Sequence, residues 1–205
     1  PLPDALPISA STSPSWISQV APRGRFGRHG ADNRRKNRAQ LKDPAKMTPQ
    51  TIENFGSPLY GQLKQAAGEA WPAYVEHAFV RGLGDGSLPN ASFLHYLKQD
   101  YVFLIHFSRA WALAVAKSDR VEEMRQMAVT VNALLNDEMP LHVRTCAAIG
   151  ISETDLAQTL EAPQTLAYTR YVTDAGLRGD LLDLLTALMP CVLGYGDIGA
   201  SRAPK

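Results

Sequence analysis

The stretch Ala187–Gly199, which reads ALMPCVLGYGDIG, continues an apolar helix that is expected to begin near Asp180. Apolar residues fall on every side of this helix, which predicts that it is buried all round. Pro190 lies inside it, removes one backbone donor and crowds the carbonyl group four residues back, so a kink is expected there. Cys191 follows at once. Its thiol either faces a cavity that the kink opens or is a small core side chain, since free cysteine is among the most buried residue types.

Length and composition fit one sizeable core with an uneven distribution of charge. The chain has 205 residues, 45% of them hydrophobic, and a net charge of +1. Residues 1–46 carry nine Lys/Arg against three Asp/Glu, whereas residues 47–205 carry 12 against 17. A nucleic-acid-binding domain would carry its basic residues on the folded part. The acidic balance of residues 47–205 therefore argues against a nucleic-acid partner.

Residues 1–46 show no helical or alternating periodicity. They are rich in Pro and Ser up to Trp16 and then basic and rich in Gly. The interpretation is a disordered or non-native leader, with Met47 as a plausible start and residues 47–205 as the folded domain. The alternative is a basic tail that binds nucleic acid.

Cysteine usage and hydropathy indicate a cytoplasmic protein. Cys146 and Cys191 form no disulfide framework, and a reducing compartment is the simplest setting for them. No run of 18 or more apolar residues occurs, so no membrane span is expected. The first residues also lack the order of a secretory signal.

Helical periodicity accounts for the rest of the chain and predicts an all-α bundle. Apolar residues recur at helical spacing, strands are not indicated anywhere, and Gly82–Pro89 is interpreted as a loop. Asn90 or Ser92 is expected to cap the helix after that loop. The expected helices are 58–80, 91–117, 119–149, a short one beginning at Ser152, 164–177, and the helix that carries Cys191.

Asp100 lies within an apolar stripe of the helix 91–117, between Leu97 and Leu104. A buried carboxylate is costly unless it is paired or hydrogen-bonded. Asp100 therefore either forms a buried salt bridge with a basic residue such as Lys98 or Arg109, or lines a polar pocket.

Glu138 and His142 are four residues apart and share one helix face. A di-iron bundle needs Glu-x-x-His pairs from two helices. Neither that spacing nor a second pair is present, so no metal site is expected, and a local hydrogen bond between the two side chains is the interpretation. Cys146 has no perturbing base near it in the sequence and is interpreted as structural.

Several motifs in order resemble the TenA family of thiaminase II enzymes, also called aminopyrimidine aminohydrolases. The resemblance covers roughly residues 57–200 and implies a heme-oxygenase-like helical fold. The motifs are Gly82–Pro89, Gln99-Asp100-Tyr101, Glu138-Met139-Pro140-Leu141-His142, Pro163 to Tyr168, and Leu188-Met189-Pro190-Cys191 with Tyr195 and Gly199.

The resemblance implies a role for each matching position. Cys191 matches the family's nucleophile, and Asp100 matches the carboxylate that hydrogen-bonds the aminopyrimidine. Tyr168 and Tyr195 match aromatic residues of the pocket. The implied reaction yields hydroxymethylpyrimidine for thiamin salvage, without a metal or organic cofactor, in a homo-oligomer that is usually a tetramer.

Two departures from the family pattern stand out. Phe103 occupies a position where some members carry a tyrosine that activates the thiol, and phenylalanine cannot hydrogen-bond to sulfur. The family also continues for further helices that supply a glutamate proton donor, which the sequence does not contain. The interpretation is a C-terminally truncated copy with an incomplete helical bundle. Its activity would depend on the further helices and their glutamate.

Two other functions remain open. One is a non-catalytic pyrimidine-binding or regulatory protein on the same fold. The other is a relative that binds haem or a quinone-type cofactor, which would need a proximal histidine in the first helix, where His77 lies near the end.

Deletion of residues 1–46 should change the free energy of unfolding by less than about 0.5 kcal/mol, because no periodic apolar face is lost. Urea unfolding of the two forms checks this, and a large loss of stability would show that the leader packs on the domain.

Overall fold

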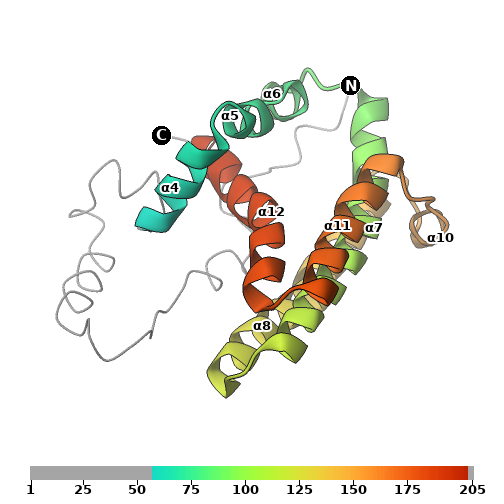
Figure 1. Cartoon of the computed structure of the whole chain (residues 1–205). Coiled ribbons are helices and arrows are strands. Elements are labelled where there is room, and N and C mark those ends of the chain that lie inside the picture. Colours follow the sequence, from blue (N-terminus) through green and yellow to red (C-terminus); the bar gives the residue numbers. More distant parts are fainter. Residues whose placement is uncertain (1–56, 203–205) are drawn as a thin grey trace, which may run out of the picture. The chain divides into compact units, whose positions relative to one another are not determined.

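The computed structural model describes residues 57–202, and every regular element in this range is a helix (Figure 1). The all-α prediction is therefore confirmed for the described residues. The predicted leader, residues 1–46, lies outside them. The described residues divide into two compact units between His77 and Ala78, and each is taken by itself below.

The first unit contains α4 (Pro58–Ala67) and α5 (Ala70–Val75). The prediction of one helix over 58–80 is wrong, because the chain turns at Gly68 with a φ of 53°. That backbone conformation is open to glycine but costly for other residues. Within this unit the Tyr60 ring packs edge-on against Trp71, with centroids 5.9 Å apart.

The second unit begins with α6 (Ala78–Asp85), which lies where a loop was predicted. Gly82 is helical and buried, and the Leu88 amide donates to its carbonyl oxygen at 3.0 Å. A Cβ atom at Gly82 would lie 3.2 Å from the Leu88 nitrogen, so the glycine permits this close return of the chain. Only Gly86, with a φ of 78°, makes the turn itself.

Helix α7 (Asn90–Lys117) is the central helix of the second unit and confirms the predicted helix 91–117. Pro89 is at its N-cap position and provides no side-chain cap, so the expected capping by Asn90 or Ser92 is wrong. Figure 1 shows α11 running alongside α7. The helices that contact α7 are α8 (Val121–Ala133), α9 (Met139–Ala148), α10 (Glu153–Ala157), α11 (Pro163–Arg178) and α12 (Leu181–Arg202).

Two apolar clusters pack along α7. The larger one surrounds its C-terminal half, where Phe107 and Trp111 meet buried side chains of α12 such as Leu188. The smaller one surrounds its N-terminal half and joins Leu97 to Cys146, Ile151 and Leu156. Asp100 lies in sequence between the two clusters.

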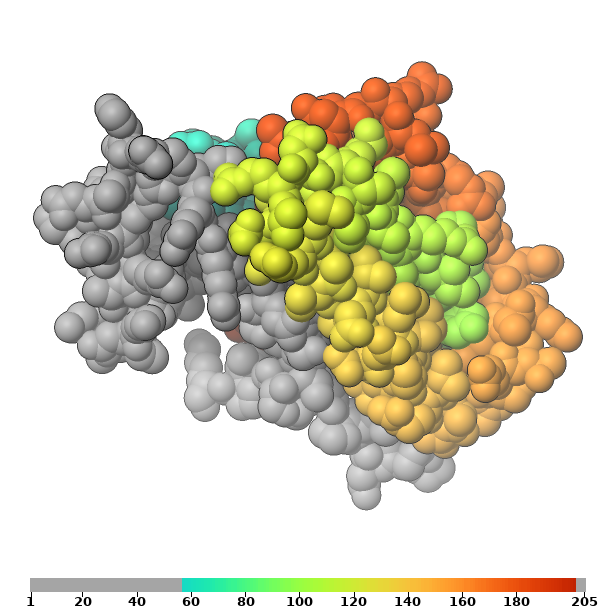
Figure 2. Space-filling view, turned by 90° about the horizontal axis from the view of Figure 1, so that it is seen from below, coloured from blue at the N-terminus to red at the C-terminus, as the bar shows by residue number. Residues whose placement is uncertain are grey.

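The predicted helix 119–149 is interrupted by one π-helical turn, η3 (Leu134–Glu138). There the Met139 amide donates to the carbonyl of Leu134, five residues back. Pro140 follows directly, and a proline lacks an amide donor and crowds the carbonyl four residues before it. The wider turn accommodates this proline and ends at Glu138. Figure 2 shows the face that α8, η3 and α9 form, coloured yellow to gold.

The predicted short helix beginning at Ser152 is confirmed. Gly150 has a φ of 85° and ends α9. Ser152 and Asp155 then form a reciprocal capping box that begins α10. Pro163 occupies the first turn of α11, where its missing amide hydrogen costs least.

Helix α12 continues through Pro190 and buries only one face, so the prediction of all-round burial is wrong. Its buried side chains recur at helical spacing, whereas Pro190 is exposed and Leu182 is 70% exposed. The buried positions are Leu184, Ala187, Leu188, Cys191, Val192 and Gly194.

By length and composition alone, Leu181–Ser201 is also long and apolar enough to cross a membrane. The core helix of a globular domain meets the same criteria, and α12 packs against α7 and α11. The hydropathy of α12 is therefore only weak evidence for a membrane span.

Leu184→Ala should lower the free energy of unfolding by about 2–5 kcal/mol, because Leu184 is fully buried and a cavity remains. Leu182→Ala, two residues away on the exposed face, is the matched control and should change it by less than about 0.5 kcal/mol. Urea unfolding measures both. Equal losses would contradict the one-sided burial of α12.

Candidate functional site

The candidate site lies where α7, α9 and α12 meet. Helix α7 carries Asp100, α9 carries His142, and α12 carries Cys191 and Tyr195. The π-helical turn supplies a fifth ionisable group, Glu138, whose charge acts on His142. The structure thus brings together side chains that are far apart in the sequence.

The Asp100 carboxyl is largely buried, with 18% of its side chain exposed. Its ion-pair partner is His142, whose Nδ1 lies 3.4 Å from Oδ2. The alternative of a salt bridge with Lys98 or Arg109 is wrong. Arg109 instead lies within 3.4 Å of His106.

His142 contacts a backbone carbonyl and a thiol, and Glu138 acts on it through its charge, whereas the predicted hydrogen bond between Glu138 and His142 stays a prediction. Its Nε2 lies 2.9 Å from the carbonyl oxygen of Leu97 and 3.5 Å from the sulfur of Cys146. Cys146 is fully buried, so its structural assignment agrees with its burial. The expectation that no base lies near it is wrong, because His142 is one helical turn away.

Burial sets the ionisation of the Asp100 carboxyl and the Cys191 thiol. It raises the pKa of Asp100 from 3.8 to about 7. It also raises the pKa of the Cys191 thiol, and the negative charge of Asp100 raises that pKa further. Cys191 is 8% exposed, and its raised pKa favours the protonated thiol.

Tyr96 belongs to the site although the sequence did not single it out. Its hydroxyl oxygen lies 3.3 Å from that of Tyr195, and burial together with the charge of Asp100 raises the pKa of Tyr96. The available signal was its spacing, because Tyr96 precedes Asp100 by four residues and so shares its helix face.

Phe103 and Tyr168 form an aromatic pair between α7 and α11. Their rings stack with centroids 6.1 Å apart, and Phe103 also stacks on Phe107 at 5.1 Å. The Tyr168 hydroxyl donates to the carbonyl oxygen of Ala187 at 3.2 Å, one turn before Cys191. A cavity of about 10 Å³, roughly the room for one water, lies against Phe103 and Tyr168.

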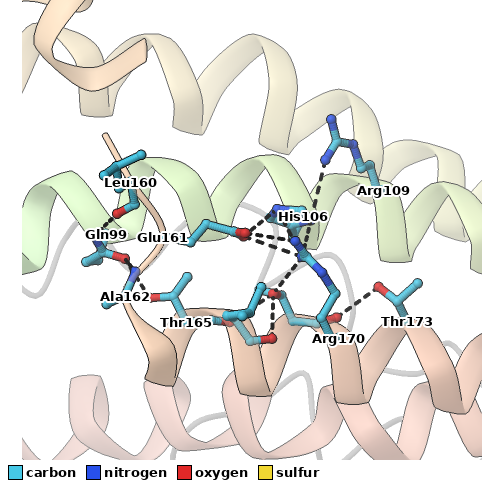
Figure 3. Close-up of polar contacts among 11 residues, drawn as sticks. Gln99, His106, Arg109, Leu160, Glu161, Ala162, Thr165, Arg170 and Thr173 are labelled. Atoms are coloured by element: carbon cyan, nitrogen blue, oxygen red, sulfur yellow. Dashed lines mark hydrogen bonds and ion pairs between the residues drawn. The ribbon is translucent and has the colours of Figure 1, made fainter. Parts of the chain in front are cut away.

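Polar contacts from Gln99 and His106 of α7 hold the segment just before α11, which carries Tyr168 (Figure 3). Gln99 donates to the Leu160 carbonyl at 2.9 Å and accepts from the Ala162 amide at 2.8 Å. About two turns further along α7, His106 lies 2.8 Å from Glu161. The segment before α11 is therefore attached to α7 at two positions, Gln99 and His106.

Among residues 57–202, no group of three or more His, Cys, Asp or Glu side chains is arranged to hold a metal ion. His77 lies in the first unit, whereas the site described above lies entirely in the second. The site therefore consists of a thiol, a carboxyl, an imidazole and tyrosine hydroxyls, a set suited to hydrogen bonding and nucleophilic chemistry.

Comparisons with known proteins found one family model and several relatives to which the chain is similar. A sequence model of the TENA/THI-4/PQQC family matches residues 64–203. An uncharacterized protein of Haemophilus influenzae is 45% identical over 137 residues, which are 67% of this chain and 63% of that protein. The aminopyrimidine aminohydrolase of Halalkalibacterium halodurans is 39% identical over 146 residues, which are 71% of this chain and 63% of that protein.

A solved structure described as a TenA family transcription regulator, from Silicibacter sp. TM1040, superimposes with a TM-score of 0.71. It is 56% identical and covers 73% of this chain and 66% of its own. The chain thus spans just under two thirds of the length of each of these relatives.

Asp100→Asn should stabilise the protein more at about pH 8 than at about pH 4.5. The folded carboxyl has a pKa of about 7 against an ordinary 3.8, so folding is penalised progressively as the pH rises through this interval. Asparagine does not ionise and escapes that penalty. Urea unfolding at both pH values measures the difference, and an equal effect at both would contradict it.

Proposed function

The chain belongs to the TENA/THI-4/PQQC family, and on this premise we propose that its site binds an aminopyrimidine and hydrolyses it through Cys191. The observation that carries the proposal is the 3.3 Å contact between the Tyr96 and Tyr195 hydroxyl oxygens, which brings the turn of α7 before Asp100 beside the turn of α12 after Cys191. The relative named aminopyrimidine aminohydrolase supports the choice of substrate class. The product would be hydroxymethylpyrimidine, which serves thiamin salvage.

Asp100 would recognise the ring. A carboxylate accepts hydrogen bonds, and the exocyclic amino group of an aminopyrimidine donates them. Tyr195 and Tyr168 would line the pocket, and Phe103, stacked on Tyr168, would present an apolar face to the ring. Tyr96 would orient the Tyr195 hydroxyl through their 3.3 Å contact.

The reaction would proceed in two steps that balance without an oxidant or reductant. The sulfur of Cys191 forms a bond to a ring carbon, and the bond between the adjacent methylene and its amine breaks. The amine leaves with the electron pair and a proton. Water then adds to the methylene carbon, the carbon–sulfur bond breaks, and the sulfur regains a proton.

Ligand binding would also activate the thiol. The Asp100 charge is one cause of the raised pKa of Cys191, and a ligand that donates to Asp100 offsets that charge. The thiol would therefore become a nucleophile mainly in the complex. Phe103 has no polar atom to assist, which makes this coupling through Asp100 the available route within the described residues.

A second candidate is a non-catalytic pyrimidine-binding protein. It is favoured by the raised pKa of Cys191 and by the relative described as a transcription regulator. Such a protein would bind the ring at Asp100 without forming a bond to sulfur. In either case the proposal includes a cytoplasmic homo-oligomer, a tetramer by the family resemblance, with no resident cofactor.

Cys191→Ser should reduce the release of amine from an aminomethyl-pyrimidine to background while far-ultraviolet circular dichroism stays unchanged, because the substitution is small. A variant that kept the wild-type rate would contradict the nucleophile assignment.

Thiol labelling with iodoacetamide separates the two candidates. A catalytic Cys191 should become more reactive when 4-aminopyrimidine is present, whereas fully buried Cys146 serves as the internal control and should stay unlabelled. Binding without any change at Cys191 would favour the non-catalytic candidate.

A further inference from the structure

The imidazole of His142 is fixed in one orientation by three neighbours. Its side chain is 9% exposed, and Tyr101 stacks on it with centroids 6.5 Å apart. Nε2 lies 2.9 Å from the Leu97 carbonyl oxygen, and Nδ1 lies 3.4 Å from Asp100 Oδ2. The ring therefore links the backbone of α7 to a side chain one turn further along the same helix.

The contact with Leu97 determines which nitrogen carries a proton. A carbonyl oxygen only accepts hydrogen bonds, so Nε2 must be the donor at 2.9 Å. In a neutral imidazole the other nitrogen, Nδ1, then carries a lone pair. That lone pair faces the Asp100 carboxyl.

A lone pair and an ionised carboxylate oxygen at 3.4 Å would repel each other. One proton between them removes the repulsion, either as a carboxylic acid beside a neutral imidazole or as a carboxylate beside an imidazolium. Both arrangements have the same net charge and differ only in which side chain holds the proton. The position of the proton therefore depends on small changes in the charges and hydrogen bonds around the pair. The separation exceeds that of a strong hydrogen bond by a few tenths of an ångström.

The groups around the pair are themselves uncharged or acidic. Tyr96 on α7, Cys146 on α9, and Cys191 and Tyr195 on α12 all respond to the charge of Asp100, and burial or neighbouring groups raise the pKa of each. Glu138 on the π-helical turn raises the pKa of His142, whereas burial, the larger effect, lowers it. His142 is the basic side chain in contact with Asp100.

We propose that His142 is a positioning residue that shares a single proton with Asp100. The proton passes between Oδ2 of Asp100 and Nδ1 of His142, so the carboxyl can either donate or accept a hydrogen bond. Where the ligand is an aminopyrimidine, as the proposed function requires, transfer to His142 leaves a carboxylate that accepts from the amino group.

The test follows both groups directly by NMR, in the full chain. Aspartate is labelled with ¹³C at the carboxyl and histidine with ¹⁵N, and the spectrum of Asp100→Asn assigns the Asp100 signal. In the wild-type protein the Asp100 carboxyl and the His142 Nδ1 signals should change over the same pH interval.

His142→Gln keeps an amide donor for the Leu97 carbonyl but has no atom that binds a proton. The midpoint of the Asp100 titration should then rise by about 1 pH unit, because the carboxylate loses its potential cation. His106→Gln is the matched control. His106 lies on α7, the helix that carries Asp100, but it pairs with Glu161, so its substitution should leave the Asp100 titration unchanged.

An unchanged Asp100 midpoint in His142→Gln would overturn the proposal. So would a wild-type His142 Nδ1 signal that stays constant while Asp100 titrates, and this comparison decides the matter if the variant does not fold. Addition of 4-aminopyrimidine separates the two proposals. If it alters neither signal while the two groups titrate together, proton sharing stands and the proposed function fails.

Discussion

A buried helix that carries a carboxyl within its apolar stripe is the constraint on which the described structure depends. Helix α7 contacts α8, η3, α9, α10, α11 and α12, so its faces are covered along most of its length. The apolar residues on both sides of Asp100 pack into two separate clusters. Between them, burying the carboxyl without a partner would cost several kcal/mol. His142, Tyr96 and Tyr195 form the polar surroundings that make this position tolerable.

The burial of Asp100 also determines how the acidic groups of the site ionise. Desolvation raises the pKa of Asp100 to about 7, and the charge that Asp100 carries when ionised keeps the nearby thiol protonated. A ring that donates hydrogen bonds to the carboxyl offsets the charge that suppresses the thiol. Under the proposed function, recognition and activation would then act through one side chain.

Predictions of helix boundaries from the sequence were wrong where helical periodicity conflicted with the preference of a glycine or proline. Periodicity over 58–80 predicted one helix, but Gly68 adopts a positive φ and ends α4 there. Three glycines between 82 and 86 indicated a loop, yet Gly82 and Gly84 are helical because the chain returns closely over Gly82. The apolar pattern over 119–149 was correct, but Pro140 required a wider turn before it. In each case a backbone requirement at one residue outweighed the average preference of its neighbours.

The sequence by itself determined the all-α class, the extents of α7 and α11, and the candidate residues Asp100 and Cys191, because periodicity and an acid in an apolar stripe are local patterns. It was also sufficient for the family resemblance. Only the tertiary structure decided that Asp100 meets His142 instead of a lysine or arginine, and that Tyr96 joins Tyr195. It also decided that α12 is exposed on one side. These outcomes depend on how separate helices rotate against one another, and spacing within one helix carries no information about that rotation.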